Sequence, residues 1–82
     1  MRVEYEPEFY KEYARLAVRN PVLHHRIEQK VPEILKNPYH YKPLRGRMKG
    51  FRRVHFGSYV LVYRVEEEVL YLVALDHHDF AY

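Results

Sequence analysis

Residue types that could do chemistry occur in two parts of the chain, a basic segment past its middle and the polar C-terminal end. Arg53 and His55 stand two residues apart, and His77, His78 and Tyr82 follow the last apolar run. Cleavage of RNA without a metal needs a base for the 2′-hydroxyl proton, an acid for the leaving 5′-oxygen and positive charge beside the phosphate. Histidine suits the first two tasks because it titrates near cellular pH, and the planar fork of arginine suits the third. Since aromatic rings also stack on unpaired bases, these residue types permit a ribonuclease.

The charges of the chain are unevenly distributed. The formal net charge is +3, but residues 42–64 contain seven Lys and Arg residues and no acid, whereas residues 65–82 contain five acids and no Lys or Arg. A concentrated positive segment attracts polyanions, of which nucleic acid is the commonest in cells. Together with His77, the candidates for RNA binding are Arg45, Arg47, Lys49 and Arg52. The alternative is that these residues form solvated strand faces and a loop.

Length and composition bound the class of protein. We expect one domain, residues 1–82, and the 48% hydrophobic content excludes extensive disorder. The absence of cysteine excludes a disulfide scaffold and a thiolate metal site. No apolar run is long enough to span a bilayer, and the N-terminus is too charged for a signal peptide. We therefore expect a cytoplasmic protein that does not bind a membrane.

The hydrophobic pattern changes its period halfway along the chain. Residues 2–5 alternate as a short strand, and apolar residues then recur at helical spacing over residues 7–19 and 21–36. Pro32 lies inside the second helix and is expected to kink or split it near Val31. Four strands follow, at residues 44–47, 51–56, 59–65 and 69–75. The order βααββββ predicts an α+β fold in which an antiparallel sheet carries the helical hairpin on one face.

Alternation along residues 51–56 predicts which side chains face away from the core. Val54 and Phe56 point to the core, so Arg53 and His55 point to the opposite face, about 7 Å apart. The His-rich end follows a buried strand directly, and loop residues held by a rigid scaffold are a common place for a site. The sequence therefore predicts that this strand and the end of the chain share one cationic surface.

The run from Leu44 to Tyr63 combines a leucine-glycine start, a basic alternating strand, a glycine turn followed by Tyr59, and a Val/Leu/Tyr strand. With the apolar strand after it and the His-rich end that closes in Tyr82, this pattern resembles the RelE/ParE toxin superfamily. It is most similar to the RelE and YafQ-like messenger-RNA interferase branch. The resemblance covers essentially the whole chain. It implies a small toxin that cleaves messenger RNA in the ribosomal A site and is neutralised by a cognate antitoxin.

The resemblance also implies roles for individual residues of the basic segment. Arg53 matches a basic strand residue that binds phosphate, and Arg45 and Lys49 belong to the basic loop that leads into this strand. His55 matches a histidine of the YafQ-like branch. The implied mechanism requires neither a metal nor an organic cofactor.

At the C-terminal end, His78 matches the catalytic histidine of the YafQ-like branch, and His77 takes this place if the end is shifted by one residue. His55 and His78 are then the acid–base pair, while Tyr82 stacks on or orients the reacting nucleotide. A metal site at the two adjacent histidines is disfavoured, because neighbouring residues of a strand point apart.

One position departs from the pattern of the family. Many members have arginine directly after the tyrosine that Tyr59 matches, and that arginine stabilises the transition state, whereas this chain has Val60. The departure shifts weight to a histidine-based mechanism and leaves an alternative function open. In the alternative, the chain is a non-catalytic module that binds a protein target such as gyrase, or that retains only antitoxin or RNA binding.

Overall fold

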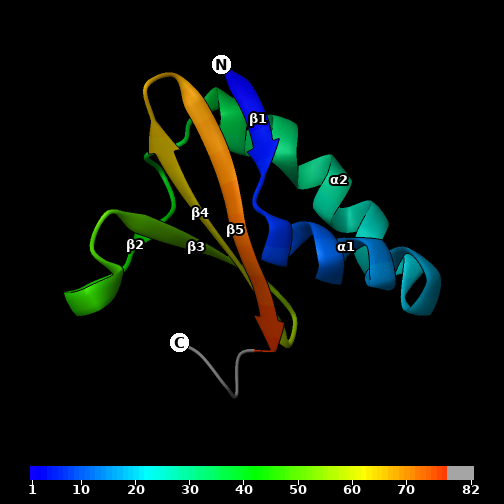
Figure 1. The fold of residues 1–82 in the computed structure, drawn as a ribbon. Helices are drawn as coiled ribbons and strands as arrows, with labels where there is room; N and C mark the ends of the chain where they lie inside the picture. Colours follow the sequence, from blue (N-terminus) through cyan, green and yellow to red (C-terminus); the bar gives the residue numbers. More distant parts are fainter. Residues whose placement is uncertain (78–82) are drawn as a thin grey trace.

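Helices and strands make up most of the computed structural model, which describes residues 1–77 of the chain (Figure 1). Strand β1 (Arg2–Tyr5) is followed by helices α1 (Pro7–Arg19) and α2 (Pro21–Lys36). A short strand β2 (Lys42–Pro43) and one turn of 3₁₀ helix (Gly46–Met48) lead to three longer strands. These are β3 (Phe51–Phe56), β4 (Tyr59–Glu66) and β5 (Val69–His77). The order of the elements confirms the predicted βααββββ succession.

The five strands form one sheet in the order β1-β5-β4-β3-β2, and the helices pack on one of its faces (Figure 1). The predicted α+β fold is therefore confirmed. The sheet is mixed, however, because β1 pairs with β5 in parallel, whereas all other neighbours are antiparallel. The prediction of an antiparallel sheet was wrong for this pair. Alternation within a short strand does not identify its partner, and the helices supply the long connection that parallel pairing requires.

Local sequence explains where the two helices begin. Pro7 occupies the first turn of α1, where its missing N–H is not needed. At the start of α2, the Asn20 side chain accepts a hydrogen bond from the backbone N–H of Leu23 at 3.2 Å. Each helix buries one apolar stripe, which comprises Phe9, Tyr13 and Leu16 in α1 and Leu23, Ile27 and Ile34 in α2. Within residues 1–77, no helix is long and apolar enough to cross a membrane.

Helix α2 continues through Pro32, so the split expected near Val31 is absent. Proline removes one backbone hydrogen bond and disfavours the helix locally. Ile27 and Ile34, which lie on either side of Pro32, are both fully buried in the core. Packing of both halves of the helix against the same core offsets the local loss.

The predicted strand at residues 44–47 was wrong. Strand pairing with β3 is confined to Lys42 and Pro43, and a 3₁₀ turn follows. The reason is the backbone of Gly46, whose φ of +65° lies in the left-handed region and ends any extended structure. Strand β2 pairs only with Arg52 and Arg53, so residues 54–56 of β3, which include His55, have no partner in β2.

Tyr63 is the largest fully buried side chain among the described residues, and it lies on the face of β4 that the helices cover. Its hydroxyl donates a hydrogen bond to the carbonyl oxygen of Pro38 at 2.6 Å, which ties β4 to the segment after α2. Burial raises the pKa of Tyr63 to about 12. The hydroxyl therefore keeps its proton, and its role as a donor, throughout the physiological pH range.

We expect Tyr63→Phe to reduce the free energy of unfolding by about 1–2 kcal/mol, because the Pro38 carbonyl loses its buried donor. Urea unfolding of the two proteins measures this loss. The folded-state pKa lies above the ordinary value of 10.0, so the stabilisation from Tyr63 is fully present below pH 10 and is lost as the pH rises toward 12. The variant should lose less stability than the wild type over this interval. An equal loss in both proteins would contradict the role given to the hydroxyl.

Candidate nucleic-acid interface

Strand β3 presents basic side chains on the side of the sheet away from the helices, which we call the outer face. Val54 and Phe56 are 6% and 3% exposed and belong to the core. Because side chains alternate along a strand, Arg53 and His55 lie on the outer face. There His55 is exposed and Arg53 is half-buried. The predicted division of β3 into two faces is confirmed.

The strand register extends the outer face across the sheet. His55 pairs with Val60 of β4, and Val60 pairs with Asp76 of β5. Directly paired residues share a face, so these three residues form one row. Val60, which stands where the resemblance places a transition-state arginine, is fully buried. The row therefore has an apolar side chain in its middle and titratable groups at its two ends.

A β-bulge in β5 decides which side chains reach the outer face near the end of the strand. The register shifts between Val62 and Tyr63 of β4, and Val73 of β5 is left as an extra residue. One extra residue reverses the alternation of the strand beyond it. Leu75 consequently joins the core, and Asp76 faces outward.

His77 lies on the side of the sheet that the helices cover. It pairs with Tyr59, and the two rings make an edge-to-face contact with their centroids 5.6 Å apart. The structure therefore does not bring His77 together with His55 on one surface, which corrects the expectation of a shared RNA-binding face. The bulge is the physical reason. The other two predicted residues of this end, His78 and Tyr82, lie outside the described residues, and their roles stay predictions.

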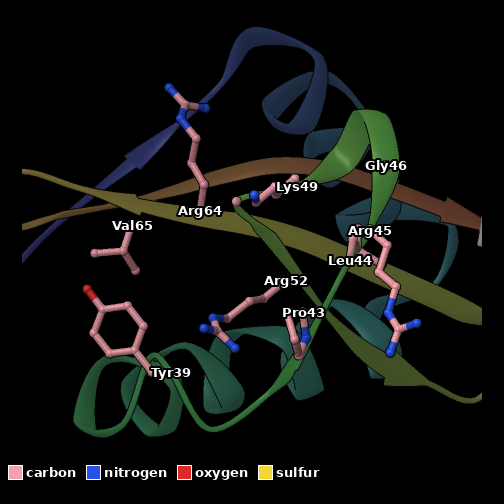
Figure 2. Close-up of a pocket in the computed structure, with 10 residues that line it drawn as sticks. Tyr39, Pro43, Leu44, Arg45, Gly46, Lys49, Arg52, Arg64 and Val65 are labelled. Atoms are coloured by element: carbon pink, nitrogen blue, oxygen red, sulfur yellow. The ribbon is translucent and has the colours of Figure 1, made fainter.

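The basic loop between α2 and β3 borders a pocket of about 480 Å³ at the start of β3, which we call the loop pocket (Figure 2). Three of the predicted RNA-binding residues line it, namely Arg45, Lys49 and Arg52. Arg47 belongs to the same loop and is exposed, but it does not line the pocket. Arg53 and His55 do not line the loop pocket.

Arg64 also lines the loop pocket, but its charge is already compensated. Its guanidinium pairs with Glu6 at 2.6 Å and with Glu66 at 3.2 Å. The hydrogen bond that Arg64 donates to the Glu6 carboxylate is the largest cause that raises the pKa of Arg64. Figure 2 shows this side chain directed away from the Arg52 guanidinium and from Tyr39, so Arg64 closes the β-sheet end of the pocket rather than offering its charge there.

The remaining cations of the loop pocket differ in how firmly they are held. Arg52 donates a hydrogen bond to the carbonyl oxygen of Tyr41 at 2.8 Å, and its guanidinium lies 5.4 Å from the centre of the Tyr39 ring. Within residues 1–77, no ion pair or side-chain hydrogen bond joins Arg45 or Lys49 to another residue. The pocket therefore combines one fixed guanidinium with two uncompensated positive charges.

Sequence reasoning missed cations of α2 that lie beside His55. Arg26 and Lys30 line a shallow hollow of about 250 Å³ together with His55 and Phe56. The Arg26 guanidinium lies 5.9 Å from the centre of the Phe56 ring. A spacing of four residues places Arg26 and Lys30 on one face of the helix. The sequence shows that spacing, but not that this face borders β3.

The candidate residues thus occupy two places that can do different things. On the outer face, Arg53 offers a planar fork for phosphate beside the imidazole of His55, a combination suited to proton transfer at a phosphodiester. Around the loop pocket, cations and apolar side chains form a concave surface. In the part of the chain that the structure describes, no group of three or more His, Cys, Asp or Glu residues is arranged to hold a metal ion.

Comparison with known proteins identifies the class that this fold and surface represent. A family model described as the ParE toxin of type II toxin-antitoxin system, parDE, matches residues 3–82. A protein of Methanocaldococcus jannaschii with the name RelE4 is 39% identical over 83 residues, which cover 98% of this chain and 88% of that protein. The chain therefore belongs to the ParE toxin family, within the RelE/ParE superfamily of type II toxin-antitoxin systems. The resemblance drawn from the sequence is confirmed at this level.

Solved structures share the fold along nearly the whole chain. The YoeB/ParE toxin from Agrobacterium tumefaciens has a TM-score of 0.87 at 18% identity, over 95% of this chain and 99% of that chain. A chain of the intact E. coli RelBE toxin-antitoxin complex has a TM-score of 0.76 at 23% identity, over 93% and 94% of the two chains. At these identities, the likeness shows the arrangement of two helices on a five-stranded sheet.

Proposed function

We propose that this toxin is an endoribonuclease that cleaves messenger RNA, in the ribosomal A site, without a metal or an organic cofactor. The observation that carries the proposal is the placement of Arg53 and His55 on the outer face of β3. A phosphate-binding fork and a group able to transfer protons are needed side by side for this reaction. Membership of the RelE/ParE superfamily supports the same conclusion.

The proposed reaction is a transfer of the phosphoryl group within the RNA strand. A base takes the proton of the 2′-hydroxyl, the 2′-oxygen bonds to phosphorus, and the bond to the 5′-oxygen breaks as an acid protonates it. The products are a 2′,3′-cyclic phosphate and a 5′-hydroxyl. Arg53 binds the phosphate and stabilises the negative charge of the transition state. His55 and His78 transfer the two protons, and Tyr82 orients the nucleotide.

The proposal includes a cognate antitoxin as the partner of the chain. The E. coli RelBE structure is a toxin-antitoxin complex, and the matching family model describes toxins of such two-component systems. A toxin that acts on translated messenger RNA would work in the cytoplasm, contact the ribosome and require no membrane. Its antitoxin would suppress activity by covering the cationic surfaces or by displacing the end of the chain.

Induced expression in a bacterial host, followed by mapping of messenger-RNA ends, tests the proposal. The expected result is growth arrest with new 5′-hydroxyl ends inside translated reading frames. Co-expression of the cognate antitoxin should prevent both effects. Growth arrest with intact transcripts would contradict the endoribonuclease and leave toxicity by another route.

Val60 favours a second candidate function. An apolar, fully buried residue takes the place of the arginine that stabilises the transition state in many members of the superfamily. A toxin that acts by binding a protein such as gyrase needs no such charge. This candidate predicts growth arrest with DNA damage and unchanged messenger RNA, which the same expression experiment detects.

A further inference from the structure

The loop pocket combines features that the proposed cleavage reaction does not use. It lies where the loop after α2 meets the start of β3 and the end of β4, whereas His55 stands near the other end of β3 on the outer face. The pocket contains about 480 Å³, which is in the size range of small-molecule sites. An independent ligand, or a separate part of the same ligand, can therefore occupy it.

Two planar groups form one wall of the loop pocket. The Tyr39 ring is 64% exposed, and the Arg52 guanidinium lies 5.4 Å from its centre. The hydrogen bond to Tyr41 fixes the guanidinium in this position. Figure 2 shows the Arg52 side chain extending toward the Tyr39 ring. Val65, which belongs to β4, also lines the pocket. Aromatic rings and guanidinium planes are the groups on which unpaired bases stack.

The charges around the loop pocket favour an anion. Arg45 and Lys49 line it, neither forms an ion pair within residues 1–77, and no carboxylate is among the lining residues. Pro43 and Leu44 add apolar surface from the loop. A ligand that matches this set has a flat ring, some apolar area and at least one negative charge.

We infer that the loop pocket is a nucleotide-binding subsite that holds one unpaired base and its phosphate. The base lies against Tyr39 and Arg52, and Lys49 and Arg45 bind the phosphate at the rim of the pocket. Figure 2 shows the exposed Arg45 side chain directed away from Tyr39, so this side chain has to turn toward the pocket when the phosphate binds. The inference rests on the proposed function only in that the nucleotide belongs to the RNA substrate. In that role, the subsite anchors the strand away from the cleaved linkage and contributes to the choice of sequence.

An acidic peptide segment, for example from a partner protein, would match the charge but not the planar wall. Carboxylates need cations, and aliphatic side chains need apolar surface, but neither requires an exposed aromatic ring beside a fixed guanidinium. The observations therefore favour the nucleotide. Binding of an acidic peptide in place of a nucleotide is an outcome that the test below can distinguish.

The test measures binding of adenosine 5′-monophosphate and of ribose 5-phosphate, which keeps the phosphate and lacks the base. Nuclear magnetic resonance titration should shift the amide signals of Leu44, Gly46 and Gly50 in the wild-type protein. Tyr39→Leu should weaken the binding of adenosine 5′-monophosphate by at least about fivefold, the lower end of what stacking contributes, and leave ribose 5-phosphate nearly unchanged. Tyr10→Leu, at another exposed tyrosine, is the matched control.

The charge contribution is tested with neighbouring cations of the basic segment. Arg45→Gln and Lys49→Gln should weaken the binding of both ligands, whereas Lys42→Gln should have little effect because Lys42 is exposed and does not line the pocket. Equal losses in all three variants would overturn the subsite in favour of diffuse attraction to a basic loop. Equal affinity for the two ligands, or binding only of a glutamate- and leucine-containing peptide, would also overturn it.

Failure of the subsite can be told apart from failure of the proposed function. Nucleotide binding at the loop pocket in a protein that cleaves no RNA would support the subsite and contradict the endoribonuclease. Cleavage of RNA at an unchanged rate and with unchanged sequence preference by Tyr39→Leu would contradict the subsite and leave the endoribonuclease intact.

Discussion

Replacing His55 by alanine is expected to abolish growth arrest and to slow RNA cleavage by at least about 100-fold, because a positioned acid or base contributes about 10²–10⁴-fold. His55 lies on the outer face beside Arg53, and its side chain is exposed. An exposed side chain contributes little to packing, so the fold should be unaffected. The rate of cleavage of a defined messenger RNA by purified protein measures the effect directly.

His25→Ala is the matched control for this experiment. It makes the same change of side chain at another exposed histidine, on α2. The control should cleave at the wild-type rate, and both variants should keep the wild-type melting temperature and affinity for the antitoxin. Undiminished growth arrest by His55→Ala would remove this residue from the mechanism and favour the toxin that acts by binding a protein.

The faces of β3 could be predicted because the information is local. Val54 and Phe56 alternate with Arg53 and His55 within six residues, and no irregularity interrupts the strand. Because the apolar pair must be buried, the polar pair that alternates with it has to point to the opposite face. The same reasoning located the stripes of both helices, because each helix begins at a proline and repeats its apolar residues at helical spacing.

The end of β5 could not be predicted, because one residue changes the outcome. The apolar run around Val73 has no polar residue that would reveal a bulge in the sequence. The bulge exists only relative to β4, and it reverses the faces of Asp76 and His77. Deciding which of Asp76 and His77 faces outward therefore requires the register of β5 against β4, and alternation within a single strand does not provide this register.

The basic segment illustrates a second limit of sequence reasoning. Its net charge predicted attraction to polyanions, but the positions of the charges depend on the left-handed turn at Gly46 and on the shortness of β2. These features carry Arg45 and Lys49 to the loop pocket, away from the outer face. A segment that is continuous in the sequence is thus divided in the fold between the outer face and the loop pocket, where the proposed reaction and the proposed nucleotide subsite would lie.

Replacing Arg53 by glutamine is expected to reduce the rate of RNA cleavage by more than about tenfold, because in the proposed mechanism the transition state loses the charge that stabilises it. Glutamine keeps part of the aliphatic stem of this half-buried side chain, so that lost packing contributes little. Single-turnover cleavage separates the rate of the chemical step from RNA binding. The chemical step should slow more than binding weakens, since the charge on the phosphate develops in the transition state.

Two further variants make the Arg53 result specific. Arg53→Lys keeps the charge but not the planar fork, so its rate should lie between those of the wild type and Arg53→Gln. Arg19→Gln removes the same charge from an exposed position at the end of α1 and should slow the chemical step by less than about twofold, since remote charges are screened by salt. If Arg53→Gln cleaves within about twofold of the wild-type rate while Arg19→Gln does the same, the phosphate does not bind at Arg53. The reaction site would then have to lie elsewhere on the chain.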